Sequence, residues 1–209
     1  MRRADWERLL TQWAAAAVAA VKWVSHVNGV NAPKEMQNWL TDRVSLTVKL
    51  IAHSQNFRVQ RLVQQRAHCL ADEFSMVGLP RRSCVQERDV LLRCDAKPVV
   101  FAHTIVPLTA SATDWPFFSS LGERSLGTTL FGDPLVKRGA LQYARLPMRH
   151  PLQLRARAVV GKEMEDGPLF ARRCLFRRKK GLLLVTEVFL PAIDHLRPRL
   201  KVLDTKAFL

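Results

Sequence analysis

Two pairs of apolar runs, each joined by a short polar turn, stand out in the pattern of hydrophobic and polar positions. In the first pair, runs rich in β-branched residues occupy positions 90–94 and 99–106. In the second pair, the runs 171–177 and 182–190 flank a turn that ends at Gly181. Apolar runs separated by a few turn residues are typical of antiparallel hairpins. The pattern therefore predicts two β-hairpins with a less regular segment between them.

Helical periodicity marks the N-terminal part of the chain. Over residues 4–25, apolar side chains recur at three- and four-residue spacings, which predicts an amphipathic helix. The pair Asn28-Gly29 is a suitable end for it. Pro33 suits the first position of a second, short helix, because the N–H that proline lacks would have no partner there. We expect that helix to bury Met36, Trp39 and Leu40.

Three further segments are open to more than one interpretation. Residues 44–51 and 57–64 are rich in Val, Leu and Ile. They could form the tail of the second helix followed by a strand, or two strands. Residues 113–131 look helical or loop-like, because Thr113 or Asp114 suits a helix cap while glycines interrupt the segment.

The hairpins occur without a regular alternation of strands and helices. This favours an α+β fold, with a single antiparallel β-sheet and helices packed on one face, over a doubly wound fold. No Pro- or Gly-rich linker divides the chain. We expect residues 1–31 to form an N-terminal helical extension packed on the domain, and residues 32–209 to form that single domain.

The charge of the chain is unusual for its size. Its 209 residues are enough for one domain with a hydrophobic core. The formal net charge is +15 and the isoelectric point is about 10.7. Such an excess draws anions toward the protein. The anion could be nucleic acid, an acidic membrane surface or a small dianion, and composition alone does not choose among them.

The cysteines and the N-terminus indicate a reducing, cytoplasmic location. None of the four cysteines forms a C-x-x-C pair, so we expect free thiols rather than a zinc or thioredoxin-type motif. No apolar run approaches the roughly 20 residues that span a bilayer. Asp5 and Glu7 lie just before the apolar N-terminal stretch, where a secretory signal usually lacks acids.

Common catalytic and cofactor motifs are absent from the sequence. It has no G-x-G-x-x-G, P-loop or H-E-x-x-H pattern and no G-x-S-x-G elbow. The six histidines do not pair at metal-ligand spacing. His103 lies inside an apolar strand, where we expect a buried histidine with satisfied hydrogen bonds rather than a metal ligand. An enzyme with this sequence would need neither cofactor nor metal.

Two charged residues lie on apolar faces of the predicted strands. Glu187 shares its face with Leu183, Val185 and Phe189, and a buried carboxylate is almost always paired. It could belong to a structural ion pair or to a functional site. Arg88 is in register with apolar residues of the other hairpin. It could pair with Glu187 directly, or it could bind a carboxylate that arrives with a ligand, which the guanidinium fork suits.

Four segments together resemble the chorismate pyruvate-lyase family. They are 88–92 with 104–107, 121–122 with 125–131, 183–191 and, more weakly, 39–40 with 45–47. They occur in the order expected for the family, and the three stronger segments together are specific. Residues 132–171 look longer than in the shortest members of the family, and neither the resemblance nor the hydrophobic pattern assigns them a role.

The resemblance implies a fold in which flap segments close over an internal ligand site. It implies a cofactor-free carbon–oxygen lyase that converts chorismate to 4-hydroxybenzoate and pyruvate, the first committed step of ubiquinone biosynthesis. The ligand-site arginine of the family falls on Arg88 and its essential glutamate on Glu187, both as catalytic and substrate-binding residues. Leu46 and Leu126 fall where the family offers main-chain N–H groups to the ring carboxylate. Methionine is common at the position of Leu46, and a backbone contact tolerates that difference.

The resemblance also sets expectations for partners. Chorismate is the expected substrate, its product is expected to be retained in a closed site, and the protein is expected to be a monomer. A weak association with an acidic membrane surface would use the basic excess. Two alternatives stay open: a non-catalytic relative that binds an aromatic acid, and a basic nucleic-acid-binding module. No nucleic-acid partner is expected, because basic runs such as 177–180 are not accompanied by a recognised nucleic-acid motif.

Overall fold

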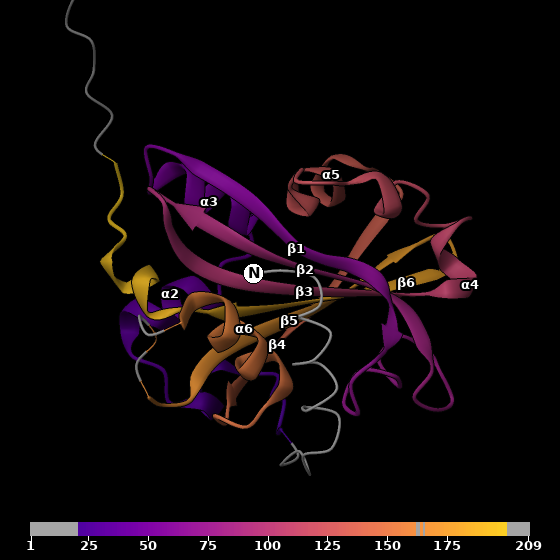
Figure 1. Ribbon diagram of the computed structural model, residues 1–209, viewed down its shortest axis with the longest axis horizontal. Helices are drawn as coiled ribbons and strands as arrows, with labels where there is room; N and C mark the ends of the chain where they lie inside the picture. Colours follow the sequence, from indigo (N-terminus) through magenta and orange to yellow (C-terminus); the bar gives the residue numbers. More distant parts are fainter. Residues whose placement is uncertain (1–20, 162–163, 165, 200–209) are drawn as a thin grey trace, which may run out of the picture.

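A six-stranded antiparallel β-sheet is the centre of the computed structural model, which describes residues 21–161, 164 and 166–199 (Figure 1). The strand order is β1-β2-β3-β6-β5-β4, and each neighbouring pair is antiparallel. The strands are β1 (Phe57–His68), β2 (Cys84–Cys94), β3 (Lys97–Pro107), β4 (Val136–Leu146), β5 (Leu169–Arg178) and β6 (Gly181–Phe189). The predicted α+β class with one antiparallel sheet is confirmed.

Both predicted hairpins are present, β2–β3 and β5–β6. The β2–β3 turn consists of Asp95 and Ala96, whose φ angles of 48° and 70° are both positive. Positive φ at both central residues is what a two-residue type I′ turn requires, and its twist matches that of the strands it joins. β3 also pairs with β6, so the two hairpins form one continuous sheet with β3 and β6 in the middle.

The strand register divides the side chains into two faces. Arg88, Thr104 and Val185 lie in one row across β2, β3 and β6. We call their side of the sheet the pocket face. Asp89 and His103 form the next row and point to the other side, because successive side chains of a strand alternate. We call that side the network face.

Short helices connect the strands. They are η1 (Val27–Val30), α2 (Lys34–Leu40), α3 (Leu46–Ala52), α4 (Leu108–Ser111), η2 (Phe118–Ser120), α5 (Leu126–Gly132), α6 (Pro151–Val160) and η4 (Pro191–His195), where η denotes a 3₁₀-helix. The helix predicted after Pro33 is confirmed as α2, with Met36, Trp39 and Leu40 buried. The ambiguous segments 44–51 and 57–64 correspond to a separate helix, α3, followed by strand β1.

Helices cover both faces of the sheet, which corrects the expectation of one covered face. On the pocket face, Leu40 of α2 and Leu50 of α3 share a core cluster with Val90. On the network face, Leu152 of α6 packs in a cluster with Phe101. Figure 1 shows α6 on the side of the sheet away from α3 and α5.

Helix α6 and strand β4 belong to the segment 132–171, which the hydrophobic pattern did not interpret. β4 is an edge strand, and most of its residues are exposed or half-buried. It therefore lacks the continuous apolar run that marked the inner strands. α6 buries Gln153 and Arg155 beside its apolar residues, so its inward side does not appear apolar in the sequence.

One other local prediction is wrong where the structure describes the chain, and the segment 113–131, which was open between helix and loop, contains both. The helix predicted over 4–25 lies mostly outside the described residues, but 21–25 are not helical. There, Val24 pairs with Tyr143 of β4 through two main-chain hydrogen bonds of 2.9 and 2.8 Å, which cover part of an open sheet edge. Residues 113–117 form turns rather than a capped helix, and the next helical turn begins at Phe118. The division of the chain at residue 31 stays a prediction.

The cysteines form no disulfide, and none of the described helices suits a membrane span. All four cysteines are free, as predicted. Among the described residues, no helix is long and apolar enough to cross a membrane.

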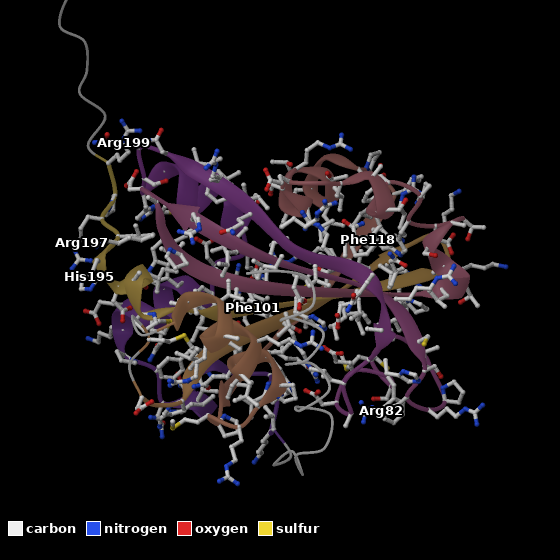
Figure 2. All side chains as sticks on the ribbon, in the orientation of Figure 1. Arg82, Phe101, Phe118, His195, Arg197 and Arg199 are labelled. Carbon is white, nitrogen blue, oxygen red and sulfur yellow. The ribbon has the colours of Figure 1, made fainter. Side chains whose placement is uncertain are left out.

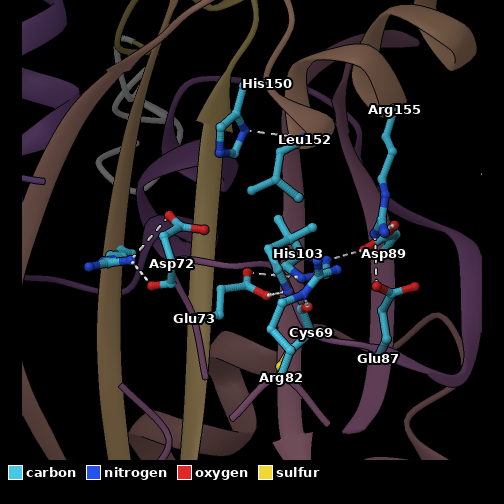
Figure 3. Close-up of polar contacts among 12 residues, drawn as sticks. Cys69, Asp72, Glu73, Arg82, Glu87, Asp89, His103, His150, Leu152 and Arg155 are labelled. Carbon is cyan, nitrogen blue, oxygen red and sulfur yellow. Dashed lines mark hydrogen bonds and ion pairs between the residues drawn. The ribbon is translucent and has the colours of Figure 1, made fainter. Parts of the chain in front are cut away.

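The network face carries a buried cluster of charges (Figure 3). The His103 ring contacts Asp89 Oδ1 through Nδ1 at 2.6 Å and Glu73 Oε1 through Nε2 at 3.2 Å. Arg155 of α6 donates from Nη1 to Glu87 Oε2 at 2.8 Å and to Asp89 Oδ2 at 3.0 Å. All five side chains are buried. The expected burial of His103 is confirmed, with Nδ1 hydrogen-bonded to Asp89, while Nε2 contacts Glu73 as an ion pair without hydrogen-bond geometry.

Two cations face three carboxylates in this network, and burial together with the neighbouring Asp89 raises the pKa of Glu87 above its ordinary value. Burial alone would lower the pKa of His103, but Glu73 and Asp89 raise it well above its ordinary value of 6.5. Glu87, Asp89 and His103 place their ligand-type atoms within 4.8 Å of one another, a spacing that suits a metal ion. However, the Arg155 guanidinium already bonds to both carboxylates. The cluster is therefore an ion-pair network that fastens α6 and the loop at Glu73 to the sheet.

We predict that His103→Leu lowers the free energy of unfolding by about 3–5 kcal/mol, since it leaves buried carboxylates short of a cation. His103 has a raised pKa in the folded state, so its contribution is complete below pH 6.5 and is lost as the pH rises through the folded value. Urea denaturation of wild type and variant from pH 6 to 9 measures this. Phe101→Leu, on the same face of β3, is the control and should cost the same amount at each pH. A pH-independent difference for His103→Leu would contradict the prediction.

Candidate active site

One cavity lies between the pocket face of the sheet and the N-terminal ends of α3 and α5. It contains all four predicted site residues: Arg88, Glu187, Leu46 and Leu126. The other residues around it are mostly apolar, and its polar lining also includes Thr47, Thr104, Ser125, Arg138 and Arg172. Residues from distant parts of the sequence thus meet around one partly open cavity.

Arg88 and Glu187 do not pair with each other. They lie on β2 and β6, which are separated by β3, so their backbones are about 10 Å apart by strand spacing. Their side chains share the pocket face because Arg88 faces Thr104, while Glu187 faces Ala102, two residues earlier on the same strand. This leaves space for a ligand of ring size between the guanidinium and the carboxylate.

Arg88 is a buried cation with an incomplete set of partners. Its side chain donates from Nη2 to the carbonyl oxygens of Gly122 and Arg124, both at 3.0 Å. Its Nε is buried and lacks a hydrogen-bond partner among the described residues, and no carboxylate of that part of the chain forms an ion pair with it. Burial, and then the nearby Arg61, lower the pKa of Arg88 to about 10. The guanidinium is therefore well placed to bind an incoming carboxylate.

Glu187 pairs with Arg172, a residue that the sequence analysis did not select. Arg172 Nε donates to Glu187 Oε2 at 2.5 Å, and the two residues face each other on β5 and β6. The structural ion pair considered for Glu187 thus exists, but it lies within the cavity rather than away from it. The signal was available, because a hairpin turn at Lys179-Lys180 sets a register that places Arg172 opposite Glu187.

Two flaps close the cavity. We define flap 1 as residues 39–47, which run from the end of α2 into α3, and flap 2 as residues 122–127, which lead into α5. Leu46 and Leu126 are the first residues of their helices, so their N–H groups have no partner within the helix. The hydroxyl groups of Thr47 and Ser125 lie 2.6 Å apart and join the two flaps.

Gly127 keeps the flaps in close contact. A Cβ atom at this position would lie 2.9 Å from both Ser45 Oγ and Thr47 Oγ1, closer than such atoms pack. An added methyl group would therefore force these two hydroxyl groups to move, and that of Thr47 is already bonded to Ser125. By contrast, a Cβ at Gly132, at the other end of α5, would meet nothing within 4 Å.

Comparison with known proteins identifies the family. The model of the chorismate lyase family matches residues 17–197. This chain belongs to the chorismate lyase family. A probable chorismate pyruvate-lyase of Ralstonia nicotianae is 50% identical over 77% of this chain and 83% of its own. One of Cupriavidus pinatubonensis is 42% identical over 81% of this chain and 88% of its own. Among solved structures, the C-terminal domain of the histidine utilization repressor of Pseudomonas syringae pv. tomato has a TM-score of 0.49 and 9% identity, covering 69% of this chain and 99% of that one.

For this chorismate lyase family member, we predict that Gly127→Ala weakens binding of an aromatic acid in the cavity about tenfold, within the usual 1–3 kcal/mol cost of overpacking. The added methyl group pushes the flaps apart. Gly132→Ala is the matched control on the same helix and should bind as the wild type does. Titration with 4-hydroxybenzoate, followed by tryptophan fluorescence or calorimetry, measures both. Equal affinities for the two variants would show that flap contact does not matter.

Proposed function

We propose that this protein is a chorismate pyruvate-lyase that cleaves chorismate into 4-hydroxybenzoate and pyruvate and so supplies ubiquinone biosynthesis. The observation that carries the proposal is the buried Arg88, which forms no ion pair with a carboxylate among the described residues and faces the same cavity as Glu187. Membership of the chorismate lyase family and relatives at 42–50% identity support it.

The substrate fits the polarity of the cavity. The ring carboxylate of chorismate lies at one end of the ring, and the ring hydroxyl lies at the opposite end. We assign the carboxylate to Arg88 and to the main-chain N–H groups of Leu46 and Leu126, because charge-assisted hydrogen bonds favour an anion there. We assign the hydroxyl to Glu187, which accepts its hydrogen bond. Apolar side chains such as Val90 and Leu130 line the space between.

The reaction needs positioning more than a strong catalytic group. The bond between the ring and the enolpyruvyl oxygen breaks. The hydrogen on the hydroxyl-bearing carbon moves to the enolpyruvyl methylene, which becomes the methyl group of pyruvate. The ring becomes aromatic, which provides the driving force. Holding reacting groups in a near-attack geometry lowers a barrier by up to roughly 7–11 kcal/mol in the best cases. The residues above would select that conformer and keep water out.

The flaps that cover the site also affect the release of the product, 4-hydroxybenzoate. 4-Hydroxybenzoate retains both groups that the site recognises, the carboxylate and the hydroxyl, so the contacts proposed for substrate also hold product. We therefore expect product to remain in the closed site until the flaps separate. A monomeric state and a cytoplasmic location stay predictions.

We predict that the purified protein converts chorismate to 4-hydroxybenzoate without added metal or nucleotide, as detected by mass spectrometry. Arg88→Ala and Glu187→Ala should each lower kcat/KM by on the order of 100-fold, about 3 kcal/mol, since each removes a polar contact to the bound substrate. Circular dichroism checks that they remain folded. Arg93→Ala is the control, because Arg93 lies on β2 but bonds to Gln60 and Ala96 away from the cavity. Binding of 4-hydroxybenzoate without turnover would instead indicate a non-catalytic aromatic-acid-binding protein.

Weak association with an acidic membrane surface is supported by exposed apolar side chains beside a cation. Val44, Val48 and Ile51 of flap 1 and α3 are 57, 52 and 49% exposed, and Arg43 is exposed next to them. Interfacial binding combines buried apolar area with attraction to anionic lipids, to which a nearby Lys or Arg adds about 1 kcal/mol. The net charge of +15 acts in the same direction.

We predict that the protein co-sediments with phosphatidylglycerol vesicles at low salt and not with phosphatidylcholine vesicles. Val48→Ser combined with Ile51→Ser should reduce the bound fraction several-fold, because it removes apolar area that would enter the interface. Met148→Ser is the control, since Met148 is also exposed (43%) but lies between β4 and α6. A wild type that stays in the supernatant with both vesicle types would contradict this association.

A further inference from the structure

We propose that Arg172 is a positioning residue of the active site, which holds the Glu187 carboxylate toward the ring hydroxyl and ties flap 1 to the sheet. This inference rests on the proposed function, because it assigns Glu187 to the hydroxyl and the Leu46 N–H to the ring carboxylate. It extends that function by a residue that acts through these two groups.

The hydrogen bonds of Arg172 run in two directions. Nε donates to Glu187 Oε2 at 2.5 Å, so one side of the guanidinium is used by the carboxylate. Nη1 donates to three main-chain carbonyls of flap 1, those of Trp39, Leu40 and Asp42, at 3.0, 3.2 and 2.9 Å. The Arg172 side chain is only 2% exposed, so water does not readily replace these contacts.

Each group that Arg172 holds lacks an equivalent substitute. Trp39 and Leu40 are the last residues of α2, where carbonyls have no partner from within the helix. Glu187 lies on β6 with apolar neighbours on the same face, and its side chain is 19% exposed. Removal of the guanidinium would leave the carboxylate free to turn and three carbonyls without their donor.

The contact reaches Leu46 through a short segment that is bonded to α3. The Asp42 side chain accepts a hydrogen bond from the Val44 N–H at 2.8 Å, and its other oxygen pairs with Lys49 of α3 at 2.9 Å. The segment between Arg172 and the start of α3 is thus bonded at both ends. Displacement of residues 39–42 would therefore carry the Leu46 N–H with it.

Arg88 makes the corresponding contact with flap 2. Its Nη2 donates to the carbonyls of Gly122 and Arg124, just before Leu126. Each flap is thus fastened to the sheet by a buried arginine through main-chain carbonyls, and the half-buried Arg138 also donates to the Arg43 carbonyl of flap 1. The difference is that Arg172 already has the Glu187 carboxylate as its partner, whereas Arg88 has none among the described residues. The two arginines on this face therefore have different tasks. Arg88 binds the ligand, and Arg172 orients the ligand's other contacts.

The experiment compares Arg172→Met with Arg173→Met. Arg173 is the next residue on β5 and is also buried, but it points to the network face, where it bonds to Gln142 and Asp72. Affinities for 4-hydroxybenzoate and for benzoate, which lacks the hydroxyl, are measured for each protein. Their ratio reports the hydroxyl contact and does not change when a variant is merely less stable.

For Arg172→Met we expect the preference for 4-hydroxybenzoate over benzoate to fall about tenfold, with a drop in kcat of at least the same size. Benzoate affinity should also fall, because the Leu46 N–H is displaced. Arg173→Met should lose stability yet keep the wild-type ratio within about twofold. If Arg172→Met does not fold, Arg172→Lys replaces it. That variant retains the charge beside Glu187 but cannot span the three carbonyls, so it should keep the ratio better than the benzoate affinity.

The outcomes separate this inference from the function on which it rests. A folded Arg172 variant with an unchanged ratio overturns the positioning role. A wild type that prefers 4-hydroxybenzoate but does not turn over chorismate overturns the enzymatic function, and the ratio still decides the role of Arg172. A wild type that does not distinguish the two acids overturns the assigned hydroxyl contact and the inference together.

Discussion

The active site depends on buried arginine side chains on one face of the sheet. A guanidinium is always charged under ordinary conditions, and burying it is costly unless its donors are satisfied. Arg172 meets this requirement with the Glu187 carboxylate and main-chain carbonyls of flap 1, whereas Arg88 meets it only in part, through two main-chain carbonyls of flap 2. Those carbonyls can come close only when the flaps lie over the sheet. The cost of burying two cations is therefore offset by contacts that also shape and close the cavity.

The two faces of the sheet handle charge in different ways. On the network face, His103 and Arg155 form ion pairs with Glu73, Asp89 and Glu87 within the protein itself. This network fastens α6 and the Glu73 loop. On the pocket face, Arg88 is left without a carboxylate in the part of the chain that the structure describes. Stability and ligand binding are thus assigned to opposite sides of the same strands, one residue apart at positions 88 and 89.

This arrangement separates two effects of the excess of basic residues, long-range attraction and recognition in the cavity. The overall positive field draws anions of any kind toward the protein. In the proposed site, recognition falls to one deeply buried guanidinium and to main-chain groups around the cavity. The nucleic-acid alternative is supported only by the charge. The charged residues that the structure gathers into one cavity line a space whose other side chains are mostly apolar.

Much of the site could be predicted from sequence because strand periodicity is local. Alternation placed Arg88 and Glu187 among apolar residues, which marked them as buried charges, and family resemblance assigned their roles together with Leu46 and Leu126. The hairpins followed from apolar runs around short turns. Strand β4 and helix α6 were missed, since an edge strand and a helix that buries Arg155 lack a clean apolar pattern.

What only the tertiary structure decided is which charges meet. The sequence by itself determined that Arg88 and Glu187 would lie among apolar residues, but left open whether they would pair and how far each would be buried. The pairing of β3 with β6 placed a strand between them, so they face each other across a space instead of forming a salt bridge. Arg172 then took the carboxylate, and the flap carbonyls took the remaining donors. Such pairings depend on the order of strands in the sheet, which is a long-range property that local periodicity does not contain.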